Sequence, residues 1–185
     1  MRSNRGERGV KVRIALPFVC VVLLLAAVCY GDGTAKLAVA QINNSEGVPV
    51  GIASFSEGTE GVKISVHVAS LPPGYHGLHI HEKGVCVAPD FNWAGGHFNP
   101  FGREHGLKNP KGPHAGDLPN LLVGPDGEGA GVFLAPMVTL RQGENSLFRP
   151  DGTALVIHGS PDDHMTQPSG RGGKRLACGV IKALE

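Results

Sequence analysis

Apolar and polar positions alternate in several short segments of this chain. Residues 62–69 show the pattern most clearly, because β-branched residues alternate there with polar ones: Val62, Lys63, Ile64, Ser65, Val66, His67 and Val68. A period of two places the apolar side chains on one face of a strand and the polar side chains on the other. This segment is therefore predicted to be a β-strand with one buried face and with His67 on the solvent side.

Seven further segments carry strand signals, and turn-forming residues separate them. They are residues 35–43, 49–56, 75–82, 118–124, 129–135, 153–158 and 176–182. Short strands joined by Gly-rich turns are typical of sandwiches and barrels. We therefore predict an all-β fold, an eight-stranded Greek-key β-barrel or sandwich.

One long stretch departs from this alternation. Residues 83–117 contain Gly, Pro, His and Asn and show little periodicity. A loop of about 35 residues without secondary structure is uncommon in a compact domain unless something orders it. A bound metal ion is the obvious candidate, because metal binding contributes folding free energy to the segment that supplies the ligands.

The first 33 residues form a segment of a different kind. Five cationic residues precede the uncharged, mostly apolar run 14–28: Arg2, Arg5, Arg8, Lys11 and Arg13. This layout predicts a secretory signal, since the run is shorter than the roughly 20 residues of a membrane-spanning helix. Cys29 follows Ala-Ala-Val, which loosely resembles a lipoprotein box. Cleavage near residues 29–34, lipid attachment at Cys29 and an uncleaved anchor remain open.

The remaining residues, 34–185, suit one exported domain. A chain of 185 residues with a net charge of +1 has no strong field that would attract nucleic acid. We expect the domain in the periplasm, the cell envelope or the extracellular space, with membrane attachment only through the N-terminal segment. Cys86 and Cys178 are expected to form one disulfide there, and two separate buried thiols are the alternative.

Histidines supply the candidate chemistry. His79 and His81 occupy positions i and i+2 of a predicted strand, so their side chains share a face and can chelate one ion. His158 ends the predicted strand 153–158. The long loop holds three imidazoles and a carboxylate, a credible tetrahedral zinc set: His97, His105, His114 and Asp117.

Counting ligands links the two groups. Zinc takes His105, His114, Asp117 and one more ligand, while the remaining histidines also lack a fourth. His97 can serve both ions, because an imidazolate has two ring nitrogens. All-imidazole ligation suits copper. The sequence therefore predicts copper beside zinc.

Four motifs also resemble one known family. They are GLHIHEKG at 77–84, GGHFNP at 95–100, HAGDLP at 114–119 and RLACGVI at 175–181. They resemble copper–zinc superoxide dismutase, most closely the bacterial exported branch, over about residues 35–182. The resemblance implies dismutation of superoxide to oxygen and hydrogen peroxide, with one copper and one zinc per subunit. It assigns copper to His79, His81, His97 and His158, and zinc to His97, His105, His114 and Asp117.

The resemblance assigns further roles around these ligands. It implies that Asp162 joins His79 and His105 by hydrogen bonds, and that Cys86 and Cys178 form the family's internal disulfide. It makes Arg175 the residue that lines the copper channel and holds the superoxide anion, and His97 the proton donor. His76 matches a position with a structural role, whereas His164 has no assigned role.

Some departures from the family pattern concern the channel wall. Val85 and Arg171 occupy positions where the family prefers other residues, and the segment from His158 to Arg175 is about two residues shorter than in bacterial relatives.

The main alternative is a non-enzymatic, dismutase-like envelope protein that binds copper or zinc. Such members typically lack a copper ligand or the channel arginine, and this chain keeps both. A zinc-only structural domain is a second alternative, and the sequence leaves homodimer and monomer open.

Overall fold

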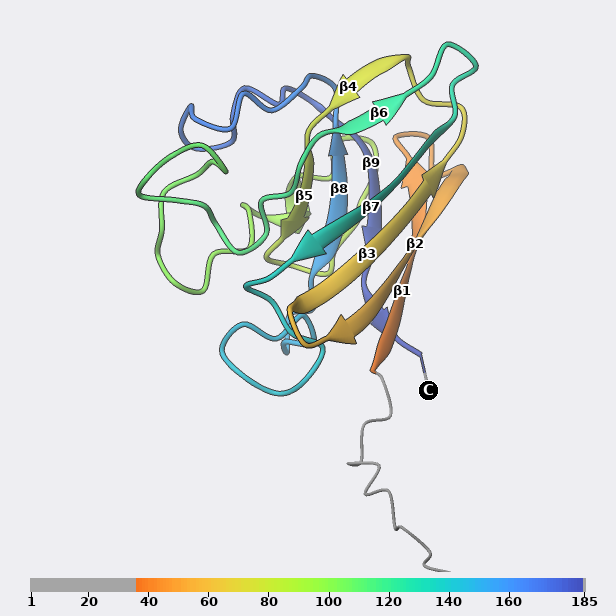
Figure 1. Ribbon diagram of the computed structural model, residues 1–185. Coiled ribbons are helices and arrows are strands. Elements are labelled where there is room, and N and C mark those ends of the chain that lie inside the picture. The colour runs from red at the N-terminus through yellow and green to blue at the C-terminus, as the bar shows by residue number, and fades with distance from the viewer. Residues whose placement is uncertain (1–35, 185) are drawn as a thin grey trace, which may run out of the picture. The chain divides into compact units, whose positions relative to one another are not determined.

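The computed structural model describes residues 36–184, which form β-strands and one short 3-10 helix (Figure 1). The elements are β1 (Leu37–Asn44), β2 (Pro49–Gly58), β3 (Gly61–Val68), β4 (Gly74–His76), β5 (Leu78–His81), η1 (Asn92–Ala94), β6 (Leu121–Val123), β7 (Gly129–Ala135), β8 (Ala154–His158), β9 (Arg175–Val180) and β10 (Lys182–Ala183). The predicted signal or anchor lies outside the described residues. Within them, no helix is long and apolar enough to cross a membrane.

The strands form one antiparallel sheet that closes into a barrel. Their order is β4-β6-β7-β3-β2-β1-β9-β8-β5, and β10 pairs with β1. The two strands at the ends of this order, β4 and β5, follow one another in the chain with only Gly77 between them, so the ends of the sheet meet. The neighbours β3–β7 and β1–β9 are the crossovers of a Greek key. The predicted all-β Greek-key fold is confirmed.

Ten strands replace the eight predicted ones, because two predicted segments divide. Residues 75–82 divide at Gly77, where the chain changes partner: β4 pairs with β6, and β5 pairs with β8. The Gly77 N–H donates to Ser160 O at 2.9 Å, and its carbonyl accepts the His158 N–H at 2.8 Å. Residues 176–182 divide at Ile181, whose N–H bonds Thr153 O. Every predicted segment contains at least one strand.

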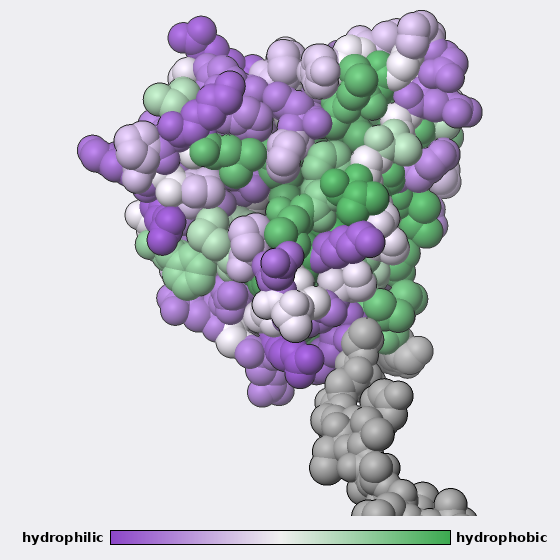
Figure 2. Space-filling view, in the orientation of Figure 1, coloured by the Kyte–Doolittle hydropathy of each residue, from purple (hydrophilic) through white to green (hydrophobic). Residues whose placement is uncertain are grey.

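Alternation builds the core on one side of the longer strands β1, β2, β3 and β7. Phe55, Ile64 and Leu155 are at most 1% exposed inside the barrel, and His67 on β3 is exposed as predicted. The outer face of β2 and β7 also carries large apolar side chains that are about half exposed, which Figure 2 shows as a green area over this sheet: Ile52, Val132 and Leu134. The core therefore lies within the closed sheet rather than between it and another layer.

Two strands, β5 and β8, are buried on both faces. Their inward residues, such as Ile80 and Ile157, belong to the main core. Their outward residues include the three histidines of these strands. Two long loops cover that outer face, residues 82–120 between β5 and β6 and residues 159–174 between β8 and β9 (Figure 1). The imidazoles of β5 and β8 therefore lie between the sheet and the two loops.

Main-chain contacts and one disulfide hold the first loop against the sheet. Phe98 N–H donates to Ile80 O and Ile80 N–H donates to Gly116 O, each at 2.8 Å. The predicted disulfide is confirmed: Cys86 joins Cys178 of β9 across a sequence separation of 92. Closing a loop of this size lowers the entropy of the unfolded chain and stabilises the fold by about 4–5 kcal/mol in the chain-entropy model.

Candidate metal centre

Two groups of donor side chains meet outside β5 and β8. The first comprises His79, His81, His97 and His158, and the second comprises His97, His105, His114 and Asp117. In each group, one donor atom per residue lies within 4.8 Å of the others. The first group combines two strands with one residue of the first loop, whereas the second lies wholly in that loop. The structure therefore brings together every ligand candidate that the sequence indicated, with His97 in both groups.

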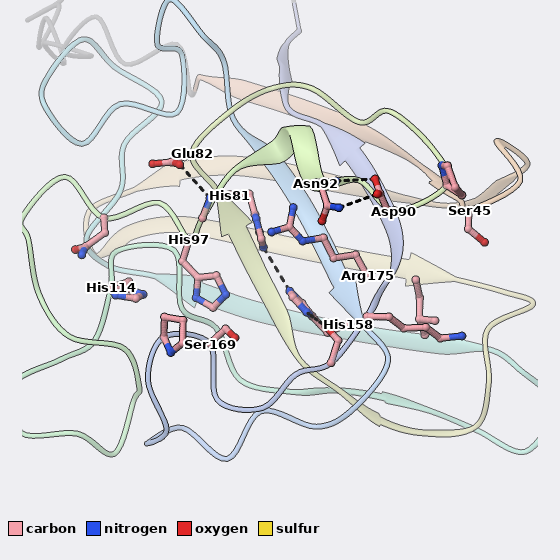
Figure 3. A pocket seen from close by; sticks show the side chains of 17 residues that line it. Ser45, His81, Glu82, Asp90, Asn92, His97, His114, His158, Ser169 and Arg175 are labelled. Carbon is pink, nitrogen blue, oxygen red and sulfur yellow. Dashed lines mark hydrogen bonds between the residues drawn. The ribbon is translucent and has the colours of Figure 1, made fainter.

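Hydrogen bonds orient the rings of the first group. His79 donates from Nε2 to Asp162 Oδ2 at 2.8 Å, and His81 donates from Nδ1 to Gly95 O at 2.9 Å. His158 turns Nδ1 toward Gly173 O at 3.4 Å. The opposite nitrogens are left facing one another, and the Nε2 atoms of His81 and His158 are 3.4 Å apart. Figure 3 shows both rings directed into one cavity with His97 beside them.

Two ring nitrogens of this group are buried and lack a hydrogen-bond partner among residues 36–184: His79 Nδ1 and His97 Nε2. A buried polar atom without a partner is costly, and in a native site it usually marks an ion or water. Four imidazole nitrogens aimed at one point fit a copper ion, and hydrogen bonds on the opposite ring nitrogens fix their tautomers. The residues present therefore fit the implied copper.

The second group converges on the carboxylate of Asp117. His97 Nδ1 and His114 Nδ1 lie 2.8 Å and 3.4 Å from its Oδ1, and His105 Nδ1 lies 3.1 Å from its Oδ2. The N–H groups of Gly106 and His114 donate to Oδ2 at 2.9 and 3.0 Å. Three imidazoles and one carboxylate fit a tetrahedral zinc ion. Since His97 turns Nε2 to the first group, its ring spans both.

Burial keeps the first group neutral. Removal from water lowers the pKa of His79 to about 3 and that of His158 to about 4, and it holds the pKa of His81 well below its usual range. Burial likewise lowers the pKa of His97, although Asp117 opposes the shift. Neutral imidazoles keep a lone pair for a metal ion.

The second group, in contrast, favours a positive charge. Burial opposes ionisation of Asp117 and Asp162, but hydrogen bonds from His105 and its neighbours hold both pKa values far below the usual range. Burial also opposes protonation of His105, but the two carboxylates beside it raise its pKa to about 9. Two buried anions thus attract a cation to this end of the site, which is what a divalent metal supplies.

Asp162 joins the two groups from behind, as the resemblance implied. Its Oδ2 accepts from His79, and its Oδ1 accepts from His105 Nε2 at 3.0 Å. Sequence reasoning missed the residue that holds it: Asn120 accepts the Asp162 N–H at 2.8 Å and donates to its carbonyl at 2.9 Å. Asn120 follows the HAGDLP motif directly, which is the signal that could have indicated it.

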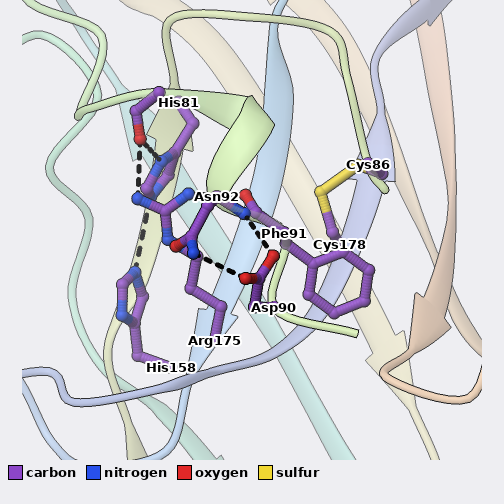
Figure 4. Close-up of a disulfide and its surroundings, with 9 residues drawn as sticks. His81, Cys86, Asp90, Phe91, Asn92, His158, Arg175 and Cys178 are labelled. Atoms are coloured by element: carbon purple, nitrogen blue, oxygen red, sulfur yellow. Dashed lines mark hydrogen bonds between the residues drawn. A yellow bond between two sulfur atoms is a disulfide. The ribbon is translucent and has the colours of Figure 1, made fainter. Parts of the chain in front are cut away.

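Arg175 lies on the open side of the first group. Its Nη1 donates to Phe91 O at 2.6 Å and its Nη2 to Gly95 O at 2.7 Å. Gly95 O also accepts from His81, so one carbonyl connects the guanidinium to a candidate ligand. Figure 4 shows Phe91 between Arg175 and the Cys86–Cys178 bridge, so the disulfide tethers the loop that positions Arg175.

A cavity of about 880 Å³ leads from solvent to this arginine, and His97, His158, Lys174 and Arg175 are among the residues that line it. Lys174 is exposed at the cavity wall. Arg171 faces Asp163, with 3.8 Å between Nε and the carboxylate.

His76 has the structural role expected for it, because its two ring nitrogens bond the carbonyls of His158 and Pro72.

We predict that Gly170→Ala weakens zinc binding at least tenfold. Gly170 has φ +61°, and a Cβ there would overlap Asp162 Oδ1 and lie 2.7 Å from His105 Nε2. Displacing such partners of metal ligands typically costs 10–100-fold in affinity. Competition with a chromophoric chelator measures the change. Gly102→Ala is the matched control, because Gly102 has the same φ with nothing within 4 Å of the added Cβ. Equal affinities in the two variants would contradict the prediction.

Comparison with known proteins agrees with this geometry. The family model for copper/zinc superoxide dismutase (SODC) matches residues 50–181. A Cu-Zn superoxide dismutase of Aquifex aeolicus is 50% identical over 145 residues, which are 77% of this chain and 85% of that protein.

Solved structures of similar proteins indicate the same family. A SOD-like protein from Bacillus subtilis has a TM-score of 0.75 and 46% identity, covering 77% of this chain and 96% of that chain. The Cu/Zn superoxide dismutase from Brucella abortus has a TM-score of 0.66 and 31% identity, covering 79% of this chain and 99% of that chain. This chain belongs to the copper/zinc superoxide dismutase family.

Proposed function

We propose that this protein is an exported copper–zinc superoxide dismutase, which converts two superoxide anions and two protons to oxygen and hydrogen peroxide. One observation carries the proposal: four imidazoles face one point, and one of them, His97, also faces a complete zinc set. The family membership supports the same activity.

We assign the ligands as the sequence predicted. His79 through Nδ1 and His81, His97 and His158 through Nε2 would hold copper. His97, His105 and His114 through Nδ1, with Asp117, would hold zinc. The orphaned nitrogens and the hydrogen bonds on the opposite ring atoms support these assignments.

Arg175 and His97 are the residues we assign to catalysis. When bound, copper supplies a centre that takes one electron from a superoxide anion and returns one to a second, while zinc supplies fixed positive charge. Arg175 binds the anion, because its guanidinium stays charged and presents a rigid fork of donors. In the state in which His97 Nε2 does not bind copper, this nitrogen would hold a proton and deliver it toward peroxide. Asp162 and Asp117 orient the rings around it.

Charge also brings the substrate to this point. Lys174 and Arg175 line the cavity together with Glu82 and Asp90, so we expect the anion to be attracted by the charge of Arg175 and of the bound metals rather than by a net cationic lining. This family is a standard example of such electrostatic steering.

The protein is exported, as its disulfide and its bacterial relatives indicate. We propose that residues 1–33 direct the export as a signal peptide or lipoprotein-type anchor, and that residues 34–185 form the dismutase domain. The cationic residues before the apolar run 14–28 support this division.

We predict that the full chain loaded with copper and zinc accelerates superoxide decay in pulse radiolysis. His158→Ala should abolish this turnover while zinc remains bound, because His158 belongs only to the copper set. His67→Ala, on the exposed face of β3, should change neither property. A fully metallated wild type that decays superoxide no faster than buffer would support the alternative of a non-enzymatic, metal-binding envelope protein. Activity in His158→Ala would contradict the copper assignment.

We predict that Arg175→Ala slows the reaction roughly 10–100-fold, since it removes a charge-assisted hydrogen bond to the anion. The rate should also depend less on ionic strength, because part of the steering charge is lost. Pulse radiolysis across a salt series measures both effects. Arg141→Ala, which removes an exposed charge away from the cavity, is the control. An unchanged rate and salt dependence in Arg175→Ala would refute its role.

A further inference from the structure

We infer that His164 is a positioning residue that holds Asp162, the carboxylate between the two proposed metal sites. The inference rests on the proposed metal assignments and deepens them. His164 lies in the loop 159–174, and neither ligand group contains it.

Both oxygens of Asp162 contact His164. The His164 N–H donates to Oδ1 at 2.7 Å, and its ring Nδ1 lies 3.2 Å from Oδ2. His105 and His79 bond the same two oxygens. The carboxylate is therefore held between the two ligand histidines on one side and His164 on the other.

Asn120 fixes the ring of His164 from its far side. The Asn120 Nδ2 lies 3.4 Å from His164 Nε2, and the same amide group brackets the main chain of Asp162. An amide N–H can only donate, so Nε2 accepts and the ring proton lies on Nδ1. The proton is thus on the nitrogen that lies 3.2 Å from Asp162 Oδ2. Nδ1 is buried and makes no well-aligned hydrogen bond within the described part of the chain, so the approach to Asp162 Oδ2 at 3.2 Å is the polar contact that compensates its burial.

The backbone supports a specific role. His164 has φ +61°, which costs a non-glycine residue on the order of 1 kcal/mol. Its carbonyl accepts the Lys108 N–H at 3.2 Å and packs on Gly106, where a Cβ would overlap it. The strained residue thus clamps the second loop onto the first loop beside His105.

Loss of the imidazole would leave Asp162 free to turn. Asp162 sets the tautomers of both His79 and His105. Loss of the His164 ring should therefore alter the binding of both metals, although His164 itself would contact neither. Partners behind metal ligands typically alter affinity 10–100-fold, and His164 acts one contact farther away, so we expect about tenfold.

Two variants separate the imidazole from the backbone. His164→Gly keeps the N–H and accepts the positive φ without strain, but it removes the ring. His164→Asn also tolerates this φ and places an amide donor at the position of Nδ1. His67→Ala is the control. We would measure zinc affinity of the full metal-free chain by chelator competition, and the Cu(II) electron paramagnetic resonance spectrum after loading both metals.

We expect His164→Gly to weaken zinc binding about tenfold and to change the Cu(II) spectrum, while His164→Asn restores both. Wild-type affinity and spectrum in His164→Gly would overturn the inference. Equal losses in the Gly and Asn variants would also overturn it, because they would indicate lost packing rather than a lost donor. A wild type that binds neither metal would instead overturn the proposed function, so the two failures are distinguishable.

Discussion

The negative charges of two buried carboxylates, Asp117 and Asp162, must be balanced inside the protein. The side chains around these carboxylates are mainly imidazoles. Burial alone would protonate them, yet their hydrogen bonds keep them ionised and raise the pKa of His105, which lies between them, to about 9. This demand for positive charge helps to explain how the loop of residues 82–120, whose one helix or strand is the short helix η1, can be ordered. A divalent cation bound to the Nδ1 atoms around Asp117 would satisfy both the charge and the orphaned lone pairs.

The barrel and its loops contribute different parts of the site. The closed sheet supplies rigidity: β5 and β8 present three imidazoles from strands that are buried on both faces. The loops supply the remaining donors and much of the cavity wall, while Arg175, which we propose binds the anion, is the first residue of β9. Three connections join these parts, namely the disulfide to β9, the carbonyl of Gly95 shared by His81 and Arg175, and the Asp162 carboxylate. In the proposed centre, chemistry at one metal would therefore depend on the geometry of the other.

The sequence predicted much of this because its signals are local. Alternation, short apolar runs and turn-forming residues located the strand segments, and the i, i+2 spacing of His79 and His81 placed both rings on one face. The division of the fourth segment at Gly77 could not be predicted, because it depends on a change of pairing partner across the barrel. Asn120, Gly170 and His164 were missed for a similar reason. Their roles arise where two aperiodic loops, far apart in sequence, pack against one carboxylate.

The central claim is that His97 joins a copper and a zinc ion into one unit. Anomalous diffraction from crystals of the metal-loaded protein, recorded at the copper and zinc absorption edges, tests it most directly. We expect a copper peak among His79, His81, His97 and His158, and a zinc peak among His97, His105, His114 and Asp117. The His97 ring should lie between them with one nitrogen toward each. A single peak, or His97 bound to only one metal in the fully loaded protein, would contradict the account.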